Sequence, residues 1–139
     1  MGLVKANIVI TNHADITLHE EGYIKDSQIR SVNVSTLVDS GAVMLAINQT
    51  IKNQLGLKVR DRRTAQLADG SVLELDVVGP LEVRFKDRFS ITNAMVLPGN
   101  EEVLLGAIPM EEMDLLIHPS KEELIVNPEH PLKPQMTLK

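Results

Sequence analysis

The chain has 139 residues, of which 43% are hydrophobic and 2% aromatic, and its net charge is −5 at pH 7. This length fits one domain that buries about two-thirds of the surface of its unfolded chain. The acidic balance, without a cluster of Lys and Arg, argues against a nucleic-acid partner, the lack of Cys excludes disulfides and a thiolate nucleophile, and no apolar stretch is long enough to span a bilayer.

The first part of the chain predicts two strands separated by a polar segment. Residues 5–10 alternate between apolar and polar types, which indicates a strand with one buried face. Residues 11–26 are polar and fit either a loop or a short helix. The β-branched residues of 32–38 then recur at period two, which predicts a strand that ends at Asp39.

The string Asp39-Ser40-Gly41-Ala42 places an acid where a strand gives way to a turn. Gly41 permits a sharp turn and the close approach of another chain segment. Taken alone, an Asp-Ser-Gly string is usually a plain turn. Its meaning therefore depends on the elements that follow it.

The next element is predicted to be a helix. Ile47, Ile51 and Leu55 recur at i, i+4 and i+8 and form one apolar stripe. Gly56 is placed to end this helix in a left-handed conformation.

A hairpin is expected after the helix. The pair Asp69-Gly70 lies between two short runs of strand-forming residues, 65–67 and 72–75. Such a pair tolerates the positive φ angles of a two-residue turn. Its tip would be either a plain solvent-facing turn or a lid over a cleft.

The second half of the chain predicts more short strands. Gly79-Pro80 indicates a bend, and an apolar run then closes on Gly106. Pro109 fits the first turn of a short helix that ends at Met113. The expected strands are 81–85 and 89–97, joined by a charged turn at 86–88, followed by 115–117 and 124–126.

Taken in order, these motifs resemble those of the retropepsin-like aspartic proteases, and especially those of small bacterial members of that clan. Leu37-Val38-Asp39-Ser40-Gly41-Ala42 matches the family's acid loop, and Leu67-Ala68-Asp69-Gly70-Ser71 falls where its flap hairpin is expected. Val103-Leu104-Leu105-Gly106 matches the element before the closing helix. The resemblance extends from about Ile29 to Asn127. It implies a mainly β fold: a closed barrel or sandwich of short strands with one or two short helices, one lobe per chain.

The resemblance also implies the site. Asp39 would be the catalytic acid, supported by the loop residues Ser40, Gly41 and Ala42. Ser40 would hydrogen-bond across a dimer axis, and Gly41 would donate its N–H toward the carboxylates. Ala68, Asp69 and Gly70 would form the flap over the substrate, and Leu104, Leu105 and Gly106 would support the site.

The mechanism of this family requires two carboxylates that share a proton. The two apolar runs that close on Gly41 and Gly106 form a faint internal repeat, but the second copy has no acid. A homodimer is therefore expected, in which the Asp39 residues of two chains meet and activate a water against an extended peptide or protein substrate. No cofactor, metal, nucleic acid or membrane partner is expected. Ala42 replaces a hydroxyl residue that is usual in pepsin-like enzymes, which predicts a pH optimum nearer neutrality.

The rival hypothesis is a catalytically silent dimeric module of the same fold that binds peptides or acts as a scaffold. Two departures from the family pattern favour it: the flap tip lacks an aromatic residue, and Ala107-Ile108-Pro109 stands where many relatives carry a polar or basic residue. Ser40 lacks the surroundings of a serine nucleophile, and the histidines lack metal-ligand spacing.

Domain organisation and location complete the expectations from sequence. One domain is expected over residues 1–139, with 128–139 an extended tail that holds three of the seven prolines in the chain. The segment 1–6 lacks both a signal-peptide apolar core and the residue pattern of a myristoylation site, so a cytoplasmic location is expected. The natural substrate and its cleavage specificity are left open by the sequence.

Overall fold

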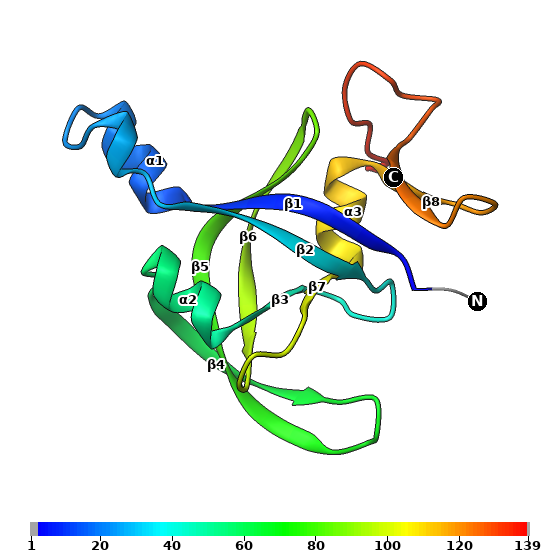
Figure 1. Cartoon of the computed structure of the whole chain (residues 1–139), viewed down its shortest axis with the longest axis horizontal. Helices are drawn as coiled ribbons and strands as arrows, with labels where there is room; N and C mark the ends of the chain where they lie inside the picture. The colour runs from blue at the N-terminus through cyan, green and yellow to red at the C-terminus, as the bar shows by residue number, and fades with distance from the viewer. Residues whose placement is uncertain (1–2, 139) are drawn as a thin grey trace.

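The computed structural model describes residues 3–138, which form a small β-barrel with short helices at its ends (Figure 1). The helical elements are α1 (His13–Glu20), the 3₁₀ turn η1 (Asp26–Gln28), α2 (Gln49–Leu55) and α3 (Ala107–Met113). The strands are β1 (Lys5–Asn12), β2 (Ser31–Val38), β3 (Leu45–Asn48), β4 (Val59–Gln66), β5 (Val72–Phe85), β6 (Arg88–Leu97), β7 (Val103–Leu105), β8 (Leu115–His118) and β9 (Glu123–Val126).

Six strands close into the barrel in the order β1-β2-β7-β3-β6-β5, because β1 also pairs with β5. Closure leaves these six strands without a free edge. The seventh strand of the sheet, β4, pairs with β5 alone and lies outside the ring. The mainly β closed barrel predicted from the sequence is therefore confirmed.

The barrel is filled by aliphatic side chains from alternating positions on its strands. In β1 the predicted face is correct, since Ala6, Ile8 and Ile10 are all buried. Phe85 is the aromatic residue among the buried core residues of the described chain. None of the helices in residues 3–138 combines the length and the apolar character needed to cross a lipid bilayer.

The two halves of the internal repeat lie side by side in the barrel. β2 and β7 are parallel, with Thr36 opposite Val103 and Val38 opposite Leu105. β3 then pairs with β7 through Ala46 and Leu104. This arrangement brings the chain after β2, which carries Asp39, next to the chain after β7, which carries Gly106.

The predicted helix starts later than its apolar stripe indicated. Ile47 belongs to β3, where it is fully buried, and α2 begins only after Asn48, whose side chain accepts a hydrogen bond from the Ile51 N–H. Asn48 sets the start of α2 because its side chain caps the first turn. Ile47 fits both a helix stripe and a strand, since its side chain would be buried in either element. The predicted end is correct: Gly56 has φ 60° and closes the helix.

One prediction about a turn needs correction. The hairpin after β4 is not a two-residue turn of Asp69 and Gly70: the Gly70 N–H bonds to the Leu67 carbonyl and the Leu67 N–H to the Ser71 carbonyl. Gly70 alone has positive φ, which is the geometry of a type I turn followed by a glycine bulge. At the predicted bend β5 continues with a shift of register between Val78 and Leu81.

Arg88 was expected to belong to a charged turn at 86–88, but it is the first residue of β6 and its side chain is fully buried. Its guanidinium donates to the carbonyl of Met113 at 3.0 Å and to that of His130. Arg88 therefore ties the end of α3 to the chain after β9. Burial without hydrogen bonds would be costly for this cation, which explains why backbone carbonyls surround it.

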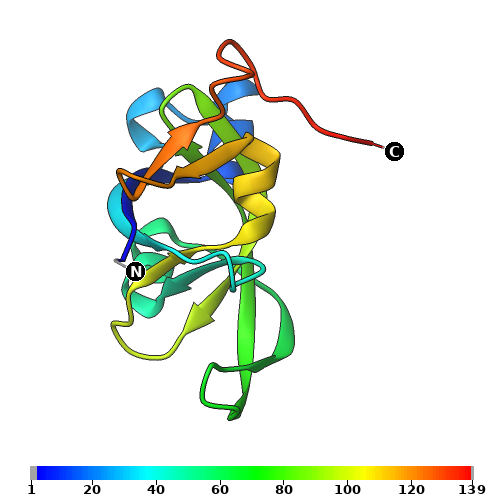
Figure 2. The ribbon, with the colours of Figure 1, turned by 90° about the vertical axis from the view of Figure 1, so that its right-hand side faces the viewer.

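The chain after β9 is held by Asp114, which has φ 56° at the end of α3. Its carboxylate accepts hydrogen bonds from the Asn127 side chain at 3.0 Å and the Gln135 N–H at 3.0 Å, and it lies 2.6 Å from the His130 ring. Burial raises the pKa of Asp114, but these hydrogen bonds and the charge of His130 together outweigh it and lower the pKa. Figure 2 shows that the C-terminal end of the chain extends away from the body after these contacts with Asp114.

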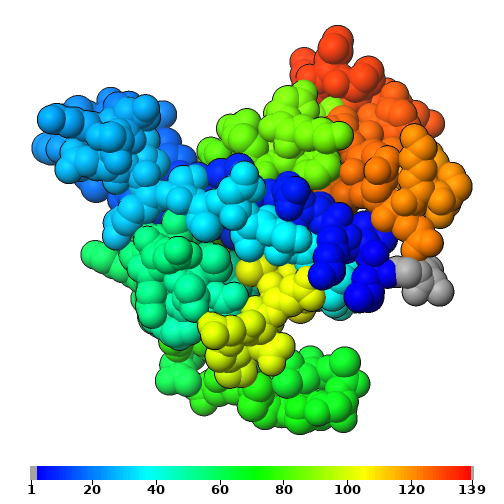
Figure 3. Space-filling model, in the orientation of Figure 1, coloured from blue at the N-terminus to red at the C-terminus, as the bar shows by residue number. Residues whose placement is uncertain are grey.

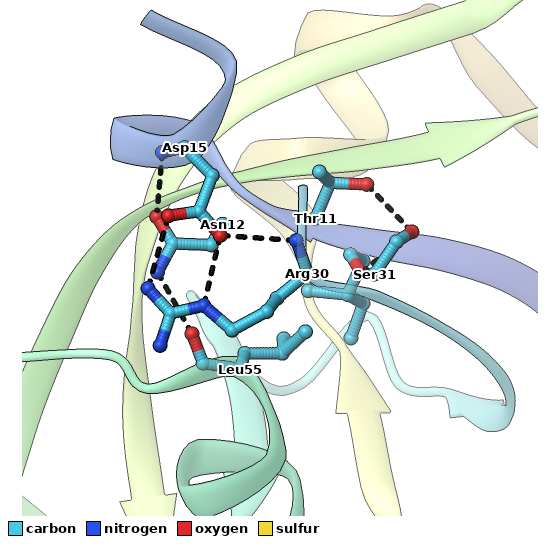
Figure 4. A network of polar contacts seen from close by, with 7 residues as sticks. Thr11, Asn12, Asp15, Arg30, Ser31 and Leu55 are labelled. Atoms are coloured by element: carbon cyan, nitrogen blue, oxygen red, sulfur yellow. Dashed lines mark hydrogen bonds and ion pairs between the residues drawn. The ribbon is translucent and has the colours of Figure 1, made fainter. Parts of the chain in front are cut away.

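A polar network closes the end of the barrel where β1 passes into α1 (Figure 4). Asp15 accepts two hydrogen bonds from the Arg30 guanidinium, both at 2.9 Å, and one from the Arg30 N–H. These bonds lower the pKa of Asp15 and raise that of Arg30. Asn12 donates to the Leu55 carbonyl at 2.7 Å and so joins β1 to α2. In Figure 1 this network lies on the opposite side of the barrel from the loop that carries Asp39.

Candidate functional site

Asp39 follows the last residue of β2 in a loop that fixes the acid at both backbone and side chain. Its N–H bonds to the Leu105 carbonyl at 3.0 Å, and its own carbonyl accepts from the Ala42 N–H at 3.1 Å. One carboxylate oxygen accepts from the Gly41 N–H at 2.9 Å. A Cβ on Gly41 would lie 3.2 Å from that oxygen, a tight contact, so the loop is built around the carboxylate.

The start of α3 holds the far side of the same loop. The Ala107 N–H donates to the Ala42 carbonyl at 2.8 Å, and the Ile108 N–H donates to the Val43 carbonyl at 3.0 Å. Between them and β7 stands Gly106, whose Cβ, if it had one, would lie 2.2 Å from the Met44 carbonyl oxygen. Only glycine permits this close approach of two backbones. The second half of the internal repeat thus supports the loop that carries the acid.

A hollow of about 660 Å³ opens between the acid loop and the β4–β5 hairpin. In Figure 3 it is the recess between the green hairpin and the body of the molecule. The residues that line it are mostly apolar, and only Asp39 and Arg63 among them carry charge: Asp39, Gly41, Ala42, Val43, Met44, Leu45, Ala46, Arg63, Thr64, Ala65, Gln66, Leu67, Ala68, Leu75, Met95, Leu97 and Leu104. An extended, largely apolar chain segment fits such a lining.

The β4–β5 hairpin overhangs this hollow and projects from the body on the same side as the acid loop (Figures 1 and 2). Ala68 lines the hollow, whereas Asp69 and Gly70 lie at the tip and are not among the lining residues. The Asp69 carboxylate accepts from both the hydroxyl and the N–H of Ser71, and these bonds lower its pKa. The tip is thus held by its own hydrogen bonds and by none to the acid loop among those of residues 3–138.

A second hollow, of about 620 Å³, lies on the other side of Asp39. Asp39 and Ser40 border it together with apolar residues from both ends of the chain, of which Leu3 is 74% exposed and Ile117 38% exposed. Its lining residues are Leu3, Val4, Leu37, Val38, Asp39, Ser40, Ile117, Pro119 and Glu122. Asp39 is therefore shared by two hollows, and Ser40 faces only the second.

Some of the residues predicted for the site line the first hollow, and others support the acid loop from behind. Asp39, Gly41, Ala42, Ala68 and Leu104 line the first hollow. Leu105 is buried and contributes its carbonyl, and Gly106 contributes its lack of a side chain. Within residues 3–138 no three His, Cys, Asp or Glu side chains form a group that could hold a metal ion.

Sequence reasoning missed Arg63, the second charged residue of the hollow. It lies in β4, whose residues are almost all exposed. An exposed strand carries no apolar alternation to indicate which face its side chains take. The flanking hairpin was the available signal, since successive side chains of a strand point to opposite faces and one face of a hairpin beside a hollow lines that hollow.

Comparison with known proteins adds one finding. A family model described as aspartyl protease matches residues 24–107, which is more than half of the chain. The matched range begins before β2 and ends at the first residue of α3, so it contains the acid loop, the hairpin and Gly106. A search of curated proteins finds no matching relative.

Proposed function

The chain belongs to the aspartyl protease family, and from this we propose that it is an aspartic endopeptidase that acts as a homodimer. The observation that carries the proposal is the position of Asp39, which borders both a substrate-sized hollow and a second, partly apolar hollow. One hollow would take the peptide, and the other would receive the second copy. A single chain offers one acid at this place, whereas the reaction uses two.

The reaction would proceed through the two Asp39 carboxylates, one from each copy. Two carboxylates a few ångströms apart do not both ionise readily, so the pair shares one proton. The ionised member accepts a proton from water as the water oxygen attacks the peptide carbonyl carbon. The protonated member gives its proton to the carbonyl oxygen, which forms a tetrahedral diol. The diol then collapses: the amine leaves with the proton that one acid took from water, and a hydroxyl of the diol returns its proton to the other acid.

The second hollow supports the dimer. Leu3 and Ile117 on its border are exposed apolar side chains that a second copy would cover, with a gain proportional to the area buried. Ser40 borders the same hollow, which suits the predicted hydrogen bond across the dimer axis. Dimer formation would then bring together the acids as well as burying apolar surface.

The substrate would be an extended peptide. The first hollow is lined mainly by apolar side chains and runs under β4, the strand that lies outside the closed ring. The outer edge of such a strand offers backbone groups to an extended chain. Neighbouring pockets would select apolar side chains.

The test compares wild type with Asp39→Asn on a proteome-derived peptide mixture, from acid to neutral pH, with cleavage read by mass spectrometry. We expect the variant to lose cleavage by at least about a hundredfold, because the acid-base pair is broken. Asp26→Asn, in the exposed turn η1 and away from both hollows, serves as the matched control and should keep cleavage. Sedimentation should show an Asp39→Asn dimer at least as stable as that of wild type, since like-charge repulsion is removed.

The silent peptide-binding or scaffold module is the alternative outcome. A verified dimer that cleaves no peptide at any pH would favour it. A dimer weakened by Asp39→Asn would also favour it, because the acid would then hold the assembly together. Cleavage that persists unchanged in Asp39→Asn would refute the role of this residue.

A further inference from the structure

The hollow beside Asp39 contains one cation in a mostly apolar lining. Among its lining residues Arg63 alone is positively charged, and the walls around it include Leu67, Leu75 and Met95. A guanidinium presents five N–H donors in a fork that matches a carboxylate. The lining thus combines apolar surface with one group of defined chemical preference.

Arg63 reaches from β4 toward the acid loop. Its Nη1 lies 4.0 Å from the sulfur of Met44, which stands in the connection between Asp39 and β3. The side chain therefore extends from the hairpin strand to the loop that carries the acid. A ligand in the hollow would pass close to this guanidinium.

The hydrogen bonds of Arg63 leave it able to bind a ligand. Its Nε lies 3.3 Å from Asp61, and both side chains are more than half exposed. Such an exposed pair contributes little to stability, so a ligand carboxylate displaces it at little cost. The terminal nitrogens of the guanidinium are free of any carboxylate partner among residues 3–138.

The other arginines of β4 are used differently. Arg62 lies 3.4 Å from Glu74 and 3.5 Å from Asp76, both on the adjacent strand β5, and it does not line the hollow. Arg60 donates to the Gly79 carbonyl at 2.9 Å. Neighbouring residues of a strand face opposite sides, which explains why Arg62 and Arg63 differ. Arg62 is therefore a matched control for Arg63.

We infer that Arg63 is a specificity residue that selects peptides bearing a carboxylate beside apolar side chains, either an acidic side chain or a C-terminal carboxylate. This inference rests on the proposed function for its substrate, a peptide. The overall charge of −5 repels anionic ligands, so a preference for them requires a local cation. Arg63 supplies that cation inside the hollow.

The experiment uses apolar octapeptides with Glu, Gln or Lys at one varied position, each made as a free acid and as a C-terminal amide. Cleavage is measured with the wild-type protein, and binding is measured separately with Asp39→Asn by affinity selection and mass spectrometry. The proteins compared in both assays are the parent, Arg63→Gln, Arg62→Gln and Arg63→Glu. Thermal unfolding checks that all variants are folded.

We expect the parent to favour Glu over Gln, or the free acid over the amide, by about fivefold to tenfold. The preference should vanish in Arg63→Gln, persist in Arg62→Gln and turn toward Lys in Arg63→Glu. Preference for Glu in amidated peptides identifies an acidic side chain as the ligand, and preference for free acids alone identifies the C-terminus. High salt should weaken either preference.

The two assays separate this inference from the proposed function. Cleavage without a carboxylate preference, or with a preference that persists in Arg63→Gln, overturns the inference but still supports the proposed protease function. Binding with an Arg63-dependent preference but no cleavage supports the inference and refutes catalysis. If no peptide is cleaved and binding shows no preference that depends on Arg63, both the inference and the proposed function are overturned.

Discussion

The close approach at Gly106 makes a quantitative prediction about the support of the acid loop. In Gly106→Ala the new Cβ would lie 2.2 Å from the Met44 carbonyl oxygen and 2.7 Å from that of Ala42. Gly106 has φ −90°, which any residue adopts, so alanine adds no backbone strain. The whole effect therefore comes from the contact with the loop, which must move by about an ångström to relieve it.

The size of the effect follows from two contributions. Overpacking against backbone costs about 1–3 kcal/mol. Displacing the loop also weakens the hydrogen bonds from Ala107 to Ala42 and from Ile108 to Val43, each contributing about 0.5–1.5 kcal/mol. We expect the free energy of unfolding to fall by about 2–6 kcal/mol, which is a large share of the stability of a small domain.

Urea unfolding followed by circular dichroism measures this loss, and amide chemical shifts should change most over residues 39–44. Gly70→Ala is the control: its Cβ would meet nothing within 4 Å, but φ there is 87°, so it should cost roughly 1–2 kcal/mol from strain alone. A loss in Gly106→Ala no larger than about 0.5 kcal/mol, well below the overpacking cost, would refute the argument that glycine is required by the loop.

Three other predictions concern charge and pH. Because hydrogen bonds from Arg30 lower the pKa of Asp15, the stability that this carboxylate contributes is present at neutral pH and is lost as pH falls from about 5 through that lowered pKa. Asp15→Asn should therefore lower the free energy of unfolding by about 1–3 kcal/mol at pH 7 and reduce its fall at acid pH, as measured by urea unfolding. The same fall at acid pH in the variant would contradict this. Asp114→Asn keeps a residue type that tolerates the left-handed backbone but weakens the anchor, so hydrogen exchange at Gln135 should accelerate; equal exchange rates would exclude the anchor. Ala42→Thr adds a donor that stabilises the carboxylates as anions, so the pH of maximal cleavage should fall by up to about one unit; a wild-type maximum already below about pH 3 would oppose the reasoning.

The parts of the fold that sequence predicted are those with a strong local pattern. Period-two alternation identified β1 and β2, and the glycine after Leu55 identified the end of α2. Ile47 was assigned to the wrong element because its burial satisfies a helix stripe and a strand equally. The capping of α2 by Asn48 decided between them, and this competition is visible only when the backbone is placed.

The candidate site was predictable to a different extent. The acid and its glycine were recognisable because turn chemistry and the family motif coincide in four residues. The position of Arg63 in the hollow and the burial of Arg88 were not predictable, since a charged residue in a polar segment is usually exposed to solvent. Arg88 is buried because carbonyls from α3 and from the chain after β9 converge on it, and these lie 25 and 42 residues away in sequence.

The division between the closed ring and β4 determines which part of the site can move. The acid loop is attached by hydrogen bonds to β7, a strand of the closed ring, and to α3, so moving Asp39 would break these contacts. β4 pairs with β5 alone and is exposed along nearly its whole length, so opening the hairpin loses little buried surface. Arg63 is carried by this strand, and a carboxylate held between it and the acid loop would favour the closed position of the hairpin. Peptide selection by Arg63 and closure over the acid pair would then be one event, so Arg63→Gln should raise KM for acidic peptides and lower kcat as well. An increase in KM with unchanged kcat would show that Arg63 contributes binding alone.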